Sequence, residues 1–226
     1  MTDERERPGL LGRLIGRRVP GRWRDSGSRP PEQRQTRALG KFVAALTHCE
    51  SPVIVDLGPV VGANVSFFGE RLRCKILVED LYADLDRATR ELRVASFRDG
   101  IAGRWPLADG TVDGVLCWDF FDYLDLKSAQ ALARRLVALV RPGGAILAFF
   151  ANERVPGEYF TRYQVVDERT VALRKYPSTC ARQLVVANRD IERLFAGLRV
   201  AESILMLSRS REVLFRKPLA SPPAAP

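Results

Sequence analysis

Short apolar runs and helix-like stretches alternate through the middle of the chain. Four runs, "VIVD", "KILVED", "VDGVLCWD" and "AILAFF", are nearly continuous in apolar residues, as in strands buried on both faces. Between them, apolar residues recur three or four positions apart, which predicts helices. This alternation predicts an α/β fold, Rossmann-like and doubly wound, with a mainly parallel sheet. The predicted strands lie near 53–56, 75–80, 112–118 and 145–150, and the helices near 63–72, 82–92 and 132–139.

The two ends of this region extend the pattern. From Glu32 onward the sequence reads as helical, with Leu39, Phe42, Val43 and Leu46 on one face, and a short strand is expected near 96–98. In the C-terminal third, 163–176 reads as a hairpin and 188–198 as a helix. Two last strands, 199–207 and 211–217, are separated by only three residues, so they must pair antiparallel. The expected sheet therefore has seven strands and ends in an antiparallel hairpin.

Composition divides the chain into one domain and two arms. Residues 32–217 carry the alternating pattern, whereas 1–31 are rich in Arg, Gly and Pro and 218–226 read as a disordered tail. The net charge is +9, and residues 1–37 alone hold ten Arg against five acids. Within the basic arm, an amphipathic turn at 10–15 would give weak contact with a membrane surface. A solvated, disordered arm is the alternative interpretation.

Bulk properties indicate an ordinary soluble protein. The 226 residues are 46% hydrophobic and 28% charged, and no apolar run approaches the roughly 20 residues that span a bilayer. The first residues lack the apolar segment of a signal peptide, so a cytoplasmic location is expected. The four cysteines are far apart and there is a single His48, so no metal site is expected.

Acidic residues follow four of the predicted strands. Asp56, the pair Glu79–Asp80, Asp99 and Asp119 each stand at or just after a strand end. In an open α/β sheet, ligands bind beyond the carboxyl ends of the strands. Clustered carboxylates repel one another unless something compensates, so four acids at one edge favour a ligand site over a purely structural role.

The glycine turn after the first strand limits which class of ligand can bind there. A dinucleotide site needs G-x-G-x-x-G, but here Gly58 and Gly62 bracket Pro59, Val60 and Val61. A ligand with hydroxyls and an amine fits the acids better than a pyrophosphate does. Because a β-branched residue disfavours positive φ, the turn must follow a different path from a glycine-rich one.

These residues resemble the motifs of class I S-adenosylmethionine-dependent methyltransferases, in the group called type 11. "VIVDLGPVVGAN" resembles the family's first motif, with Asp56, Gly58 and Gly62 matching and Val60 in place of the central glycine. "LVEDLY" resembles the second, which implies that Asp80, or its neighbour Glu79, holds the ribose hydroxyls. The resemblance covers about 32–217, and it implies S-adenosylmethionine as cofactor.

The resemblance also assigns the remaining cofactor contacts. It implies that Asp99 binds the adenine amine, that Gly100 and Ile101 flank the ring, and that Trp118 and Asp119 line the cleft. Packing in the core is the alternative role for Trp118.

The acceptor should approach over the ends of the fourth and fifth strands. This placement makes Asp122, Tyr123, Asn152 and Tyr159 candidate substrate residues, while no catalytic residue can be assigned because methyl transfer needs a base only for some acceptors. There is no Asn/Asp-Pro-Pro-aromatic motif or Pro-Cys pair, and basic residues outside the arm are scattered. The sequence thus favours a small-molecule acceptor over nucleic acid. A non-catalytic, methyltransferase-like binding or regulatory module is the alternative.

Overall fold

The computed structural model describes residues 30–154, 157–206 and 210–219. The predicted disorder of residues 1–29 and 220–226, and the predicted amphipathic turn at 10–15, lie outside these described residues.

A six-stranded sheet forms the centre of the molecule. Its order is β3-β2-β4-β5-β9-β8, in which β3, β2, β4 and β5 run parallel and β9 and β8 are antiparallel. The predicted adjacency of the four parallel strands and the antiparallel hairpin at one edge are both confirmed. The strands are β2 (Val53–Asp56), β3 (Lys75–Val78), β4 (Val112–Trp118), β5 (Val140–Ala151), β8 (Arg199–Leu205) and β9 (Ser210–Arg216).

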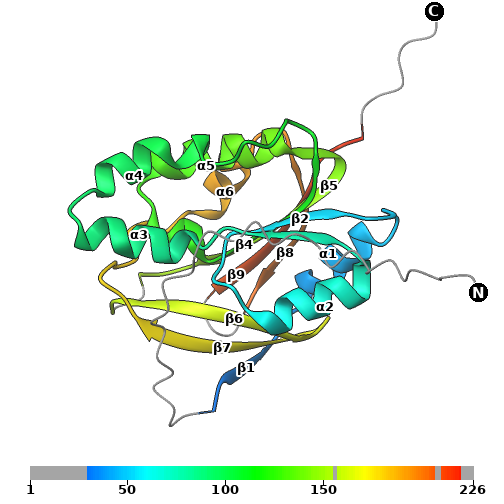
Figure 1. Cartoon of the computed structure of the whole chain (residues 1–226), viewed down its shortest axis with the longest axis horizontal. Coiled ribbons are helices and arrows are strands. Elements are labelled where there is room, and N and C mark those ends of the chain that lie inside the picture. The colour runs from blue at the N-terminus through cyan, green and yellow to red at the C-terminus, as the bar shows by residue number, and fades with distance from the viewer. Residues whose placement is uncertain (1–29, 155–156, 207–209, 220–226) are drawn as a thin grey trace, which may run out of the picture.

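Helices cover both faces of this sheet (Figure 1). One layer contains α3 (Leu81–Arg90), α4 (Val94–Gly100), α5 (Leu126–Leu139) and α6 (Asn188–Leu194), and the other contains α1 (Ala38–Leu46) and α2 (Gly62–Leu72). Because side chains alternate along a strand, Val55 and Val115 face the first layer, while Ile54 and Leu116 face the second. Each layer therefore has its own buried apolar core.

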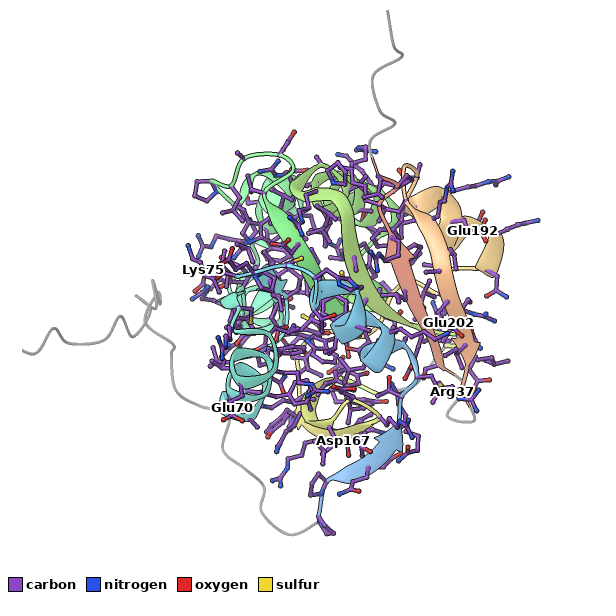
Figure 2. All side chains as sticks on the ribbon, turned by 90° about the vertical axis from the view of Figure 1, so that its right-hand side faces the viewer. Arg37, Glu70, Lys75, Asp167, Glu192 and Glu202 are labelled. Atoms are coloured by element: carbon purple, nitrogen blue, oxygen red, sulfur yellow. The ribbon has the colours of Figure 1, made fainter. Side chains whose placement is uncertain are left out.

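A second, three-stranded sheet covers the carboxyl end of the parallel strands. It has the order β1-β7-β6, all antiparallel, from β1 (Glu32–Gln35), β6 (Tyr159–Asp167) and β7 (Thr170–Pro177). Its residues Tyr163, Val165 and Val171 join the core of α1 and α2. Figure 2 shows this sheet at the bottom, with Asp167 at its turn, Lys75 at one side of the main sheet and Glu202 at the other.

Two sequence predictions are wrong. The segment expected as a strand near 96–98 belongs to helix α4, so the described main sheet has six strands rather than seven. The helix expected from Glu32 begins at Ala38, because residues 32–35 pair with β7 as strand β1. The predicted hairpin near 163–176 is confirmed, although it belongs to the second sheet.

Candidate functional site

Asp56 ends β2 with a fully buried carboxylate. Its Oδ1 accepts a hydrogen bond from the Gly58 N–H at 2.9 Å and another from the Trp118 indole Nε1–H at 2.7 Å. Burial raises the pKa of Asp56 to about 6, and the charge of nearby Asp80 adds to this rise. The two hydrogen bonds act in the opposite direction and lower the pKa. Asp56 thus connects the glycine turn to the end of β4.

The Trp118 indole lies directly on the glycine turn. A Cβ at Gly58 would stand 2.7 Å from Trp118 Cδ1, so only glycine lets the ring approach this closely. The indole also stacks on Tyr163 of β6, with ring centroids 5.2 Å apart and 4° between the planes. Trp118 also has a positive φ of 49°, which is uncommon for a bulky residue and marks local strain at this position.

The backbone conformation at Val60 is one that a β-branched residue can adopt. Among the described residues, the non-glycine positions with positive φ are Arg73, Leu92 and Trp118, so Val60 is unstrained. Val60 is 43% exposed, and its carbonyl accepts a hydrogen bond from Arg162 Nη2 at 2.7 Å. Gly62 begins α2 with no heavy atom within 4 Å of an added Cβ. Arg162 of β6 therefore holds the turn where a third glycine is missing.

Glu79 and Asp80 lie beside Asp56, as the strand register requires. Asp56 pairs with Val78 in the parallel β2-β3 ladder, and the Glu79 N–H donates to the Asp56 carbonyl at 2.7 Å. Asp80 Oδ1 caps α3 by accepting from the Ala83 N–H at 3.0 Å. Burial raises the pKa of Asp80, the cap hydrogen bond opposes the rise, and the positive charge of Arg162 also lowers it. Asp80 thus keeps its second oxygen for another partner.

Asp99, Gly100 and Ile101 do not end a strand. Asp99 and Gly100 belong to α4, and Ile101 begins a short 3₁₀ helix. The Asp99 side chain is 74% exposed with Lys127 Nζ at 3.7 Å, while Ile101 is fully buried in the core of α3 and α5. The structural basis for expecting this acid at the sheet edge is therefore wrong.

Asp119 is the centre of a buried polar cluster just after β4. Its Oδ1 accepts from the Tyr82 hydroxyl at 2.7 Å, and its Oδ2 pairs with Arg182. Burial, reinforced by the negative charge of Asp119, raises the pKa of Tyr82 well above its ordinary value, so Tyr82 remains a neutral donor. Trp118 and Asp119 therefore contact different groups: Trp118 the glycine turn, and Asp119 the α3 layer.

Three of the four predicted substrate residues, Asp122, Tyr123 and Tyr159, contact the same cluster. Asp122 is buried and accepts from the Ala151 N–H at 3.1 and 3.2 Å, and burial together with the Asp119 charge raises its pKa well above the ordinary value. The Tyr123 hydroxyl donates to the Tyr159 carbonyl at 2.8 Å. Tyr159 is half-buried at the start of β6, whereas Asn152 is exposed just beyond β5.

The sequence of residues 55–148 matches the family model described as "Methyltransferase domain", Methyltransf_11. Over these residues the chain is therefore similar to methyltransferase domains. The matched region begins inside β2 and ends inside β5, so it contains the glycine turn, Asp80 and Asp119 but not Arg182. The second sheet and the terminal hairpin lie outside the matched residues. No curated protein matches the chain in sequence.

The solved structures that match this chain share little of its sequence. The CcbJ methyltransferase from Streptomyces caelestis is 15% identical, covers 79% of this chain and 88% of its own, and has a TM-score of 0.47. A Burkholderia thailandensis 1,6-didemethyltoxoflavin-N1-methyltransferase is 17% identical, and the match covers 80% of this chain and 78% of that enzyme with a TM-score of 0.46. The [4+2]-cyclase SpnF is 11% identical (80% and 81% covered, TM-score 0.48).

Sequence reasoning missed several residues of the candidate site. Arg182 lies in the segment between β7 and α6, where no motif or periodicity draws attention to it. Tyr163 and Arg162 come from β6, which reads only as an edge hairpin, and Tyr82 fits the apolar stripe of α3. Contacts between segments so far apart in the chain leave no local signal.

Within residues 30–154, 157–206 and 210–219, no group of three or more His, Cys, Asp or Glu could hold a metal ion. None of the helices in these ranges combines the length and apolar character that crossing a bilayer requires.

Proposed function

We propose that residues 32–217 form a methyltransferase that binds S-adenosylmethionine at the carboxyl ends of β2 and β3 and methylates a small molecule. The observation that carries this proposal is the strand register, since pairing of Asp56 with Val78 puts Asp80 directly beside the glycine turn. Asp80 would hold the ribose hydroxyls with the carboxylate oxygen that does not cap α3. The match of 55–148 to a methyltransferase model supports the same cofactor.

The residues fit one half of this cofactor better than the other. Asp80 and the exposed turn at Val60 suit a ribose, but the Trp118 indole covers Gly58, where the methionine part would lie. Cofactor binding therefore requires the indole to leave Asp56 and Tyr163. Asp99 is too exposed on α4 to support an adenine contact in this arrangement, so the proposal rests on Asp80 and the turn.

The Trp118 indole that covers the glycine turn also favours a second candidate function. Stacking on Tyr163 and the hydrogen bond to Asp56 satisfy Trp118 with protein groups alone. A non-catalytic methyltransferase-like module would have this internal packing permanently, and it would use the fold for binding a partner.

Calorimetric titration of the chain with S-adenosylmethionine separates the two functions. The enzyme should bind with a Kd within about 1 μM–1 mM, the usual range of enzyme–substrate affinities. Binding should also change the tryptophan fluorescence, because Trp118 must leave its stack. Folded chain that gives no heat and no fluorescence change at saturating cofactor would support the non-catalytic module.

Replacing Asp80 should weaken cofactor binding. Asp80→Ala removes both the proposed ribose contact and the α3 cap, whereas Asp80→Ser keeps a good cap but is too short to reach a ribose. Both variants should lose about 1.5–3 kcal/mol of binding free energy, the scale of hydrogen bonds to a charged group. Titration calorimetry measures the loss, and melting of Asp80→Ser checks that the fold persists. Unchanged affinity in Asp80→Ser and in Glu79→Ala would exclude the ribose assignment.

Replacing Val60 with glycine should change cofactor affinity little. Val60 has no positive φ to relieve, and its carbonyl is already held by Arg162. Glycine would only add backbone freedom to the turn. The same titration should therefore give a Kd close to that of the unchanged chain. A tenfold tighter Kd, or about 1.4 kcal/mol, would instead mark the turn as a damaged glycine motif and favour the non-catalytic module.

A further inference from the structure

The residues that follow β4 enclose a guanidinium group from a distant part of the chain. Arg182 belongs to segment 178–187, which links β7 to α6 without forming a helix or strand. Its Nη2 pairs with Asp119 and its Nε lies 3.8 Å from Asp122 Oδ2. Its Nε also donates to the Tyr123 hydroxyl at 3.2 Å, and the Arg182 side chain is only 13% exposed.

Aromatic faces complete the enclosure. The Arg182 Cζ lies 5.4 Å from the ring centroid of Tyr123 and 5.4 Å from that of Tyr159, and Nη2 is 3.4 Å from Thr161 Oγ1. Two carboxylates, two aromatic rings and a hydroxyl are the groups that recognise a planar or compact organic cation. We call the group formed by Asp119, Asp122, Tyr123, Tyr159 and Thr161 the cation box.

The cation box adjoins the proposed cofactor cleft. Asp119 directly follows Trp118, whose indole lies on Gly58. The walls of the box come from β6 and from the end of β4 with its following 3₁₀ helix, Phe120–Tyr123, all independent of segment 178–187. Tyr82 holds Asp119 from the α3 side, so this carboxylate keeps its position without Arg182.

We propose that the cation box is the acceptor site of the methyltransferase, that it takes a small molecule carrying a guanidinium or alkylammonium group, and that Arg182 is an internal stand-in for this group. The inference rests on the proposed function. For an acceptor to enter, the Arg182 side chain must leave. Segment 178–187 can stay attached while this happens, because the Gln183 and Leu184 N–H groups donate to the Asp122 carbonyl at 2.7 and 3.0 Å.

Methyl transfer to the acceptor nitrogen balances in protons, bonds and charge with the groups of the cation box. The acceptor nitrogen first gives up a proton to the Asp122 carboxylate, whose Oδ2 lies 3.8 Å from the Arg182 Nε that the acceptor would replace. The freed lone pair then forms the N–CH₃ bond while the S–CH₃ bond breaks, and that electron pair stays on sulfur as a neutral thioether. The methylated nitrogen takes the positive charge that the sulfonium loses, so the net charge of the site is unchanged by the transfer.

The first test asks whether the emptied box selects a cation. Arg182→Ala should melt about 2–4 °C higher with methylguanidinium at several times its Kd, but not with methylurea, its neutral isostere. Arg182→Lys keeps a cation in the box and should respond to neither compound. Arg104→Ala is the matched control, because Arg104 also pairs with an acid, Asp84, and covers a ring, Phe97. Equal responses to both compounds, or an equal response of Arg104→Ala, would overturn the proposal.

The second test uses turnover by the full chain. Alkylamines and alkylguanidines should accept a labelled methyl group from S-adenosylmethionine, whereas matched alcohols and carboxylic acids should not. Asp122→Asn should reduce this transfer while cofactor affinity stays within about twofold, a difference of roughly 0.4 kcal/mol. Cofactor binding with transfer only to neutral or acidic acceptors would overturn the cation box alone. Selective methylguanidinium binding without cofactor binding would overturn the proposed function and leave a cation site.

Discussion

Glu212→Ala should lower the free energy of unfolding by about 3–5 kcal/mol, the cost of breaking a buried charged network by removing one partner. Glu212 of β9 is fully buried, and its Oε2 accepts from the Thr36 hydroxyl at 2.9 Å and from the N–H groups of Arg37 and Ala38 at 3.2 and 3.3 Å. These donors lie at the start of α1, and Arg34 is 3.9 Å from the other carboxylate oxygen. Without Glu212, several buried polar groups would lose their acceptor at once.

Urea unfolding at neutral pH measures this loss, and Glu202 gives a matched control. Glu202 is an acid of the same hairpin whose ion pair with Lys41 lies at the surface, so Glu202→Ala should cost no more than about 1 kcal/mol. Glu212→Gln keeps an acceptor without the charge and should fall between the two. Similar losses for Glu212→Ala and Glu202→Ala would contradict the proposed role of the Glu212 carboxylate.

The contribution of Asp56 to the free energy of unfolding should fall by about 3 kcal/mol as the pH rises from about 3 to about 7, with most of the fall between about pH 4 and 6. The folded pKa of Asp56, about 6, lies above its ordinary value of 3.8. Within this window the folded chain holds a proton that the unfolded chain has released, so raising the pH favours unfolding. Below the window both states are protonated, and above it the penalty for the buried charge is complete.

Asp56→Asn isolates this contribution. Both hydrogen bonds, from the Gly58 N–H and from the Trp118 indole, go to the single atom Oδ1, which an asparagine oxygen can replace. Asp80 and Asp122 also have raised pKa values, so the difference between the two chains, rather than the slope of either, reports Asp56. The variant should show a shallower dependence of urea stability on pH. Parallel curves over pH 4 to 8 would mean that Asp56 is not the titrating group.

The parallel half of the fold was predictable because buried strands leave continuous apolar runs. Strand β4, for example, is buried at all seven positions, and its neighbours read in the same way. The two wrong predictions, at β1 and α4, concern segments that have no such apolar run. Strand β1, "EQRQ", has no apolar pattern and exists only through pairing with β7. Helix α4, "VASFRDG", has Val94 and Phe97 three apart, but it is too short for periodicity to separate a helix from a strand.

The candidate site was predictable only where the backbone dictates position. Strand ends fix Asp56 and Asp119, and the cap of α3 fixes Asp80, so their clustering follows from the topology. Arg182 and Tyr163 reach the same edge through a loop and a second sheet, which no local pattern specifies. Their effect is large, because they turn a row of acids that seemed to await a ligand into groups that already have protein partners.

The position of β9 between β5 and β8 has a consequence for folding during synthesis. The ribosome makes β8 before β9, so β8 has no neighbour in the main sheet until residues 210–216 emerge. Until then, the edge of β5 exposes unpaired backbone groups next to a strongly apolar strand, which is a template for aggregation. Helix α1 is made early, but the N–H group of Ala38 at its start has no Glu212 carboxylate to bind until β9 is made. Chaperone dependence of the nascent chain should therefore end only when β9 inserts.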